Sequence, residues 1–366
     1  MNLAHLALCL PLIVSPVSRA QSEREAEVRR AVEARQRMQK GDKLSAAENE
    51  FLKSLSESVK QRNAAFGKEN PPRDSTGMVP LTELRKGYYK GEQGGIYPGG
   101  ANEPPAAHRT AGLEIARRIT PLDAEGKTTP DGKIVLLSIG MSNTTQSFQV
   151  FMKRAAADAE INPRAVIVDG AQGGNSAEVT ADPKSGFWPV VDERLSKAGV
   201  TPAQVQVIWM KQAIQMPSRP FPVEARALHG YLLENAHILS RRFSNLKIVY
   251  LSSRIYGGFA QSALNPEPHA YESGFAVNWL IADQIAGKPE LNYDPKKGAV
   301  RSAWLAWGPY LWADGIKARA DGLAWLREDL AGDGTHPSMS GREKVAGLLL
   351  DFLKKDPSSR PWFVKK

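Results

Sequence analysis

Two short segments of the chain carry side chains that could do nucleophilic chemistry. The first, residues 140–143 (GMSN), follows an apolar run and precedes a helix-compatible segment, which places Ser142 on a strand-to-helix turn. Such a turn exposes a hydroxyl and aims a backbone N–H, at the positive end of the next helix, toward a developing oxyanion. A serine here can instead simply cap the helix, so both interpretations stay open at this point.

The second segment, residues 333–336 (DGTH), sets a carboxylate three residues before an imidazole on a glycine-containing turn. Asp333 can accept a hydrogen bond from Nδ1 of His336, which fixes the tautomer and leaves Nε2 free as a base. The remaining histidines lack this arrangement, and the sequence contains no His-Glu-x-x-His or similar spacing. We therefore expect no transition-metal site.

Two further polar segments follow predicted strands. Residues 169–176 (DGAQGGNS) include Gly174, whose amide could approach a ligand closely. A phosphate cradle would need a P-loop or dinucleotide pattern, and both are missing, so a plain turn is the alternative. Residues 211–215 (KQAIQ) contain two primary amides that could donate to the same oxyanion, and we favour Gln212 over Gln215. A polar strand end is also an ordinary feature of a surface.

The elements that must position these segments are short apolar runs rich in β-branched residues, at 133–139, 164–169, 205–211 and 246–252. Each run is nearly continuous, as in parallel strands that are covered on both faces. Helix-compatible segments at 146–159, 189–197 and 222–243 alternate with them, and Ser340 with Glu343 forms a capping-box pattern before a final helix. This rhythm predicts a doubly wound α/β domain from about residue 130 onward, with ligands at the carboxyl ends of the strands.

The order of these segments resembles that of the SGNH (GDSL-type) hydrolases over residues 133–355: a serine after the first strand, Gly-Asn-Ser after the second, an amide after the third, and Asp-x-x-His before the last helix. The Ser-Asn pair is also similar to the Gly-Gln-Ser-Asn of sialate O-acetylesterase-like carbohydrate esterases. The resemblance implies a three-layer αβα, flavodoxin-like domain with a parallel sheet. It also implies Ser142 as nucleophile, His336 as base and Asp333 as its orienting carboxylate, without a cofactor.

The same resemblance implies an oxyanion hole formed by the amides of Ser142 and Gly174 and the side chain of Gln212. The expected activity is that of a secreted serine esterase working through an acyl-enzyme. Carbohydrate O-acetyl groups are the favoured substrate, and lipid and aryl esters stay open.

Two residues depart from the family pattern. Met141 stands where the family has an Asp, and Lys211-Gln212 stand where it has an Asn. These departures favour an alternative, a non-catalytic glycan-binding protein on the same scaffold. A phosphate- or nucleotide-binding flavodoxin-like domain is a third hypothesis, but it would leave Asp333 and His336 without a purpose.

The remaining sequence predicts the organisation of the chain. Residues 1–20, which hold the only cysteine, have the layout of a signal peptide, with a buried N-terminal helix as the alternative. Export would place the protein in a secreted or periplasmic location. We expect a charged helical extension at 21–65, broken near Gly41-Asp42, then Pro/Gly/Tyr-rich wrapping loops at 66–130 and the hydrolase-like domain at 131–358. No other run is long enough to span a membrane.

Composition excludes several classes of protein. The 366 residues are 42% hydrophobic and 24% charged, as in soluble globular proteins. The net charge of +9 comes from Lys and Arg that are scattered among acidic residues, so nucleic acid is not an expected partner. An aromatic-rich stretch at 256–312 is predicted to be an insertion, whose rings could stack on sugars or could hold the insertion onto the sheet.

Overall fold

The computed structural model describes residues 27, 30, 31, 33, 34, 37, 38 and 41–365. The predicted leader at 1–20 lies outside the described residues. The chain divides into two units, one ending at Lys60 and one running from Gln61 onward.

The first unit is helical on both sides of a turn at Gly41, where the backbone has a φ of 86°. The helix after the turn, α2 (Ala46–Glu69), begins with a capping box: Ser45 N donates to Glu48 Oε2 at 2.7 Å, and Glu48 N donates to Ser45 Oγ at 3.2 Å. Arg37 Nη1 reaches Glu48 Oε1 at 2.5 Å, so a side chain before the turn contacts the first turn of α2.

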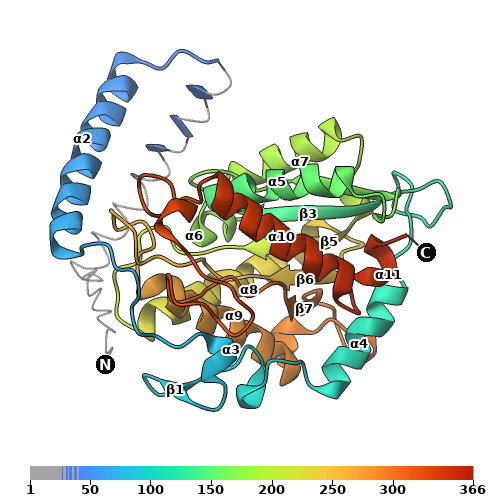
Figure 1. The fold of residues 1–366 in the computed structure, drawn as a ribbon. Helices are drawn as coiled ribbons and strands as arrows, with labels where there is room; N and C mark the ends of the chain where they lie inside the picture. Colours follow the sequence, from blue (N-terminus) through green and yellow to red (C-terminus); the bar gives the residue numbers. More distant parts are fainter. Residues whose placement is uncertain (1–26, 28–29, 32, 35–36, 39–40, 366) are drawn as a thin grey trace, which may run out of the picture. The chain divides into compact units, whose positions relative to one another are not determined.

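The second unit is an α/β structure built on a five-stranded parallel sheet (Figure 1). The strand order is β4-β3-β5-β6-β7, and the helices flank the sheet. The strands of the unit are β1 (Tyr88–Tyr89) and β2 (Glu92–Gln93), which form a separate hairpin, and β3 (Ile134–Gly140), β4 (Ala165–Asp169), β5 (Val205–Lys211), β6 (Ile248–Leu251) and β7 (Trp304–Trp307). The helices are α3 (Leu81–Leu84), α4 (Ala106–Arg117), α5 (Ser142–Ala157), α6 (Ala177–Thr180), α7 (Phe187–Lys197), α8 (Val223–Arg242), α9 (His269–Ile285), α10 (Met339–Lys355) and α11 (Arg360–Phe363).

The central strands β3 and β5 are buried along their whole length, which explains why their sequences are apolar without alternation. Helices α5 and α10 pack on each other, and aromatic pairs join them to the sheet: Phe148 of α5 stacks on Trp209, and Phe352 of α10 meets Tyr250 edge-on. The register places Gly140 opposite Lys211, so β3 and β5 end side by side. The four predicted strands and the α/β class are confirmed.

The predicted insertion at 256–312 is instead part of the α/β structure. It supplies α9 and the edge strand β7, which pairs in parallel with β6. Apart from Trp279 and Tyr293, its aromatic rings are buried in the core. Strand β7 is only four residues long and reads WLAW, so it lacks the β-branched residues on which the strand prediction relied.

Two smaller predictions also need correction. The region 66–130, predicted as loops, contains the helix α4, whose Gly112 packs against the ring of Trp304. The last helix, α10, is capped by Ser338, whose Oγ accepts from Gly341 N, and not by Ser340. Ser340 lies two residues after the true cap, and its Oγ donates instead to the carbonyl of Glu328.

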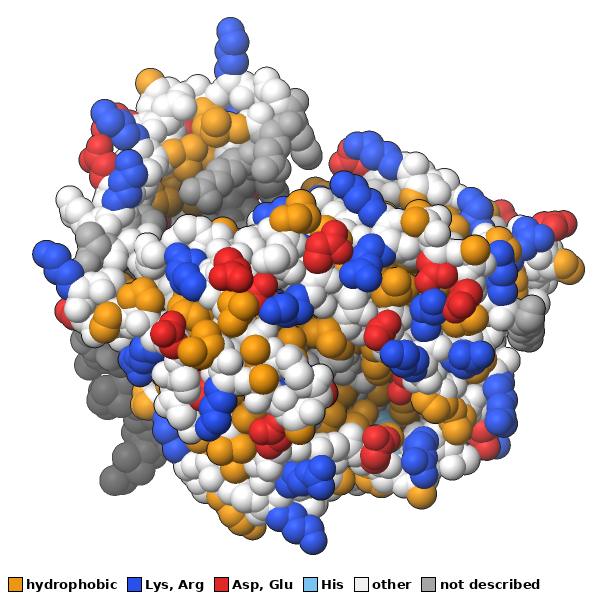
Figure 2. All heavy atoms as spheres, viewed as in Figure 1, with side chains coloured by type: hydrophobic (Ala, Val, Ile, Leu, Met, Phe, Trp, Pro, Cys, Tyr) orange, Lys and Arg blue, Asp and Glu red, His pale blue; other side chains and the backbone are white. Residues whose placement is uncertain are grey.

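Across the face shown in Figure 2, acidic and basic side chains are interspersed and neither kind gathers into one patch. Within the residues that the structure describes, none of the helices combines the length and apolar character needed to cross a membrane.

A matched pair of glycine substitutions tests the packing of α4. A Cβ added at Gly112 would lie 2.3 Å from the Trp304 ring, whereas one added at Gly230 in α8 would meet nothing within 4 Å. We expect Gly112→Ala to lower the free energy of unfolding by about 1–3 kcal/mol through overpacking. Gly230→Ala should raise it by about 0.5–1 kcal/mol through helix propensity. Denaturant unfolding measures both; equal stabilisation by the two changes would contradict the packing.

Candidate active site

Three side chains from two distant segments of the sequence form a continuous hydrogen-bonded chain. Ser142 Oγ lies 2.7 Å from Nε2 of His336, a residue 194 positions away. His336 Nδ1 lies 2.5 Å from Oδ2 of Asp333. The structure therefore brings together the hydroxyl, the imidazole and the carboxylate that the sequence singled out. This is the order of groups in which a base activates a hydroxyl and a carboxylate orients the base.

The turn that presents Ser142 depends on a glycine. A Cβ at Gly140 would lie 2.3 Å from Thr144 Oγ1 and 2.5 Å from the carbonyl oxygen of Lys211, so a larger residue cannot occupy the end of β3. The residue before the helix is Met141, which is extended and provides no side-chain cap. Ser142 is the first residue of α5, and its hydroxyl contacts His336. The interpretation of Ser142 as a helix cap is therefore wrong.

A second glycine shapes the turn that carries His336. Gly334 has a φ of +67°, and a Cβ there would lie 1.7 Å from the carbonyl oxygen of Phe259. This tight turn lets the carboxylate of Asp333 accept three hydrogen bonds: Oδ1 accepts from the N–H groups of Thr335 and His336, both at 3.0 Å, and Oδ2 accepts from the ring. The carboxylate thus fixes both the backbone and the ring of the base.

These bonds control the ionisation of Asp333. Partial burial by itself would raise the pKa of the carboxyl group. The hydrogen bonds from the His336 ring and from the two backbone N–H groups outweigh burial and hold the pKa well below its usual value of 3.8. Asp333 is therefore ionised at any pH at which the protein would work.

Backbone N–H groups are available beside the hydroxyl. The amide of Ser142 lies in the first turn of α5, where N–H groups have no intrahelical acceptor and the helix dipole is positive. Among the described residues, the N–H groups of Gly173 and Gly174 donate no hydrogen bond. A Cβ at Gly173 would come 3.8 Å from the Cβ of Ser142, so this glycine pair borders the hydroxyl. Gly174 has a φ of 76°, which disfavours any other residue.

Gln212 has a different role from the predicted one. Its Nε2 donates to the carbonyl of Asn175 at 3.1 Å and to Thr180 Oγ1 at 3.0 Å. These bonds use both amide hydrogens, so the predicted donation from Gln212 to an oxyanion does not hold. The buried side chain instead supports the turn that carries Gly173 and Gly174. Gln215, the other amide considered, is held at its backbone, where its N–H donates to Glu178 Oε1.

The same turn is fixed at its start by Asp169. This carboxylate accepts hydrogen bonds from Ser138 Oγ at 2.7 Å, from Thr145 Oγ1 and from Ala171 N. Arg194 Nη1 donates to the carbonyls of Asp169 and Ala171, at 2.9 and 2.7 Å. The chain from β4 into the glycine pair is therefore held by side chains from several elements, which keeps the free N–H groups in place.

Two further residues belong to this site: Arg254, which the sequence-based prediction missed, and Asn143, which it noted in the Ser-Asn pair without assigning a role. Asn143 Nδ2 donates to the carbonyl of Thr335 at 3.0 Å, and its Oδ1 accepts from Arg254 Nη1 at 2.5 Å. Arg254 is buried and follows β6 at the carboxyl edge of the sheet. The signal was present: a charged residue that follows a buried strand within a few positions lies at the edge where ligands bind in open α/β sheets.

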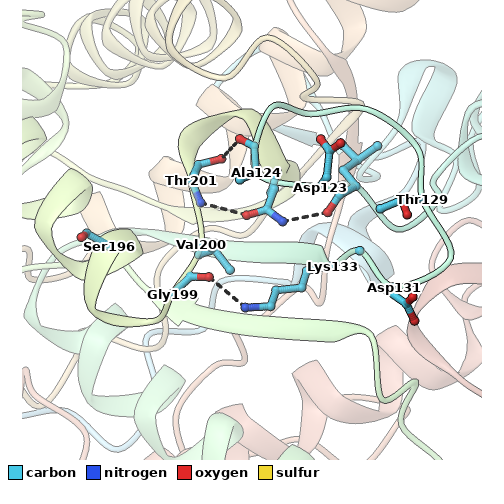
Figure 3. A pocket seen from close by; sticks show the side chains of 12 residues that line it. Asp123, Ala124, Thr129, Asp131, Lys133, Ser196, Gly199, Val200 and Thr201 are labelled. Atoms are coloured by element: carbon cyan, nitrogen blue, oxygen red, sulfur yellow. Dashed lines mark hydrogen bonds between the residues drawn. The ribbon is translucent and has the colours of Figure 1, made fainter.

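A recess lies at the edge of the sheet where β3 and β5 begin. Its volume is about 560 Å³, and its lining includes Lys133 and Gln204, which directly precede β3 and β5. Figure 3 shows Lys133 reaching Gly199 and Thr201 reaching Ala124 across this recess. Ser142 follows the opposite end of β3, about 20 Å away at ~3.3 Å per residue. The recess is therefore separate from the hydroxyl and imidazole.

No protein-family model matches the chain, and no curated protein sequence matches it. Within the described residues, no group of three or more His, Cys, Asp or Glu side chains is arranged to hold a metal ion. The geometry of Ser142, His336 and Asp333 is therefore the basis for a functional proposal.

The ionisation of Asp333 predicts a pH-dependent contribution to stability. A carboxyl group whose pKa is lower in the folded state stabilises the fold above its unfolded pKa, and the gain is lost as the pH falls toward the folded value. We expect Asp333→Asn to be less stable than wild type at pH 7 and to approach it below about pH 4. Denaturant unfolding across this range measures the difference. Asp131→Asn is the control, since Asp131 is 92% exposed in its pair with Arg164; a constant gap for Asp333→Asn would contradict the prediction.

Proposed function

We propose that the protein is a serine hydrolase that cleaves ester bonds through an acyl-enzyme on Ser142. The observation that carries this proposal is the unbroken hydrogen-bonded chain Ser142–His336–Asp333, with distances of 2.7 and 2.5 Å. A hydroxyl that only capped a helix would bond to the backbone of that helix, whereas Ser142 Oγ contacts an imidazole whose other nitrogen is held by a carboxylate.

In the first half of the reaction, Nε2 of His336 takes the proton from Ser142 Oγ as the oxygen attacks the ester carbonyl carbon. The resulting imidazolium is stabilised by the carboxylate of Asp333. It then donates its proton to the leaving alcohol as the carbon–oxygen bond breaks, which leaves the acyl group on Ser142. In the second half, His336 takes a proton from water, which attacks the acyl carbon and releases the acid, and the proton returns to Ser142.

The charge that develops on the carbonyl oxygen needs donors that are already in place. The amide of Ser142 and the free amides of the Gly173–Gly174 pair are the groups we assign to this oxyanion hole. Backbone donors of this kind contribute roughly 3–4 kcal/mol each to lowering the barrier. The assignment replaces the side chain of Gln212, whose hydrogens are used within the protein.

We further propose that the chain is an SGNH-type hydrolase with a flavodoxin-like, three-layer fold. The strand order β4-β3-β5-β6-β7 is the 2-1-3-4-5 order of flavodoxin-like sheets. The serine after the first strand and the Asp-x-x-His before α10 are the motifs on which the resemblance to this family rests. The aromatic stretch at 256–312 lends little support to a sugar-binding platform, because most of its rings are buried. The proposal of carbohydrate O-acetyl esters as substrate thus rests on the Ser-Asn pair alone. We also propose that the protein is exported, on the basis of the predicted signal peptide.

Substitution of the nucleophile tests the proposal. We expect Ser142→Ala to lower kcat for acetyl ester hydrolysis by about 10⁴-fold or more, because the attacking oxygen is lost. A fluorophosphonate probe should modify wild-type protein at Ser142 and leave the variant unmodified. A panel of acetate, longer acyl and aryl esters, measured on both proteins, would also rank the substrates.

The matched control is Ser147→Ala on the same helix. Ser147 is buried and its hydroxyl has no hydrogen-bond partner in the structure, so its removal should leave both activity and labelling unchanged. A wild-type protein that is not labelled and hydrolyses none of the esters would refute the hydrolase proposal. It would favour a binding protein on this scaffold instead.

A further inference from the structure

We propose that Arg254 is a positioning residue that sets the geometry of Ser142 and His336 through the side chain of Asn143. This inference rests on the proposed function and deepens it, because it names the interaction that holds the nucleophile and the base at bonding distance. The guanidinium donates to Asn143 Oδ1 at 2.5 Å, and the backbone N–H of Arg254 donates to Ser273 Oγ on α9 at 3.2 Å.

The guanidinium determines which way the amide of Asn143 points. Arginine offers only donors, so the amide must turn its oxygen toward Arg254 and its NH2 group away. In that orientation Asn143 Nδ2 donates to the carbonyl of Thr335 at 3.0 Å. Without the guanidinium, the amide of Asn143 could rotate by half a turn, and its oxygen would then face the carbonyl oxygen of Thr335.

The bond from Asn143 to Thr335 joins the two halves of the site. Asn143 directly follows Ser142 at the start of α5, and Thr335 directly precedes His336. Asn143 and Thr335 are both almost completely buried, so water does not compete for this bond. The separation between Ser142 Oγ and His336 Nε2 is therefore set by a second, parallel connection, which persists when the proton has moved and the direct hydrogen bond changes.

Stability alone does not account for an arginine at this position. The side chain is 2% exposed, its Nε has no hydrogen-bond partner, and no described carboxylate forms an ion pair with it. Burial lowers the pKa of Arg254 to about 10, although the negative charges of Glu267 and Asp333 act to raise it. Lys211 is buried near it, and burial together with repulsion by Arg254 places the pKa of Lys211 well below its usual value. Apolar residues in place of such buried charges commonly leave stability unchanged or raise it.

The test compares Arg254→Met with a matched control. Methionine keeps much of the volume but has no donor, so we expect kcat to fall about 10²-fold while KM changes little and the melting temperature is maintained or raised. The control is Arg319→Met, another buried arginine, whose Nη1 donates to the carbonyls of Tyr310 and Trp312. Its loss should lower the melting temperature and leave kcat and KM unchanged.

Two further variants keep the proposal testable if methionine disturbs folding. Arg254→Lys retains one donor toward Asn143 and should recover part of the lost kcat. Asn143→Asp still accepts from Arg254 but cannot donate to the Thr335 carbonyl, so it should lose about as much kcat as Arg254→Met. The combination of Arg254→Met with Asn143→Asp should be no worse than either change alone, because the two residues act in series. Full kcat in the folded Arg254 variants would overturn the proposal.

A spectroscopic measurement separates this inference from the proposed function. The Nδ1 proton of His336, in its short bond to Asp333, should give a low-field proton resonance in wild type. We expect this resonance to shift or to be lost to exchange in Arg254→Met and to stay in Arg319→Met. An identical resonance in wild type and Arg254→Met would refute positioning by Arg254, whereas a wild type without esterase activity would refute only the hydrolase assignment.

Discussion

The hydrogen bond between Ser142 and His336 depends on two glycines, Gly140 and Gly334, at which neighbouring atoms leave no room for a Cβ. At Gly140 the end of β3 lies against Thr144 and the carbonyl of Lys211, and at Gly334 the chain lies against the carbonyl of Phe259. A Cβ at either position would push one turn away from the sheet edge. The distance of 2.7 Å between hydroxyl and imidazole is thus a consequence of backbone approach, and the side chains refine what the glycines permit.

Around this bond, the side chains that hold the turns in place are hydrogen-bonded, whereas the backbone N–H groups next to the hydroxyl are free. The carboxylates of Asp169 and Asp333 each accept three or more hydrogen bonds, and both amide hydrogens of Gln212 are used. The N–H groups of the Gly173–Gly174 pair donate to nothing in the described structure. Free donors that are held in place by engaged neighbours need no reorganisation when an oxyanion forms, which is the condition for electrostatic stabilisation.

The sequence predicted the parts of the fold whose signals are local. Short apolar runs rich in β-branched residues predicted four strands, and the motifs in the sequence predicted that Ser142, Asp333 and His336 share the carboxyl edge. Strand β7 was missed because none of its four residues is β-branched and they become a strand only by pairing with β6. The role assigned to Gln212 failed because a sequence shows which amide is near a site, but not which acceptors in the fold will use its hydrogens. Arg254 was missed for a related reason, since its partner Asn143 is 111 residues away.

The charged groups at the site have opposing effects on Ser142 and His336. The start of α5 and the buried guanidinium of Arg254 both create positive potential near the hydroxyl, which in the proposed reaction would favour the negative oxygen formed during attack. The same potential would oppose the positive charge that His336 takes on in that proposed step. Asp333 resolves this conflict, because its lowered pKa keeps it ionised and its carboxylate contacts the ring directly. A neutral partner would orient the ring equally well but would leave the imidazolium facing positive potential without compensation. The tight turn at Gly334, which gives Asp333 its backbone donors, is therefore as much an electrostatic requirement as a geometric one.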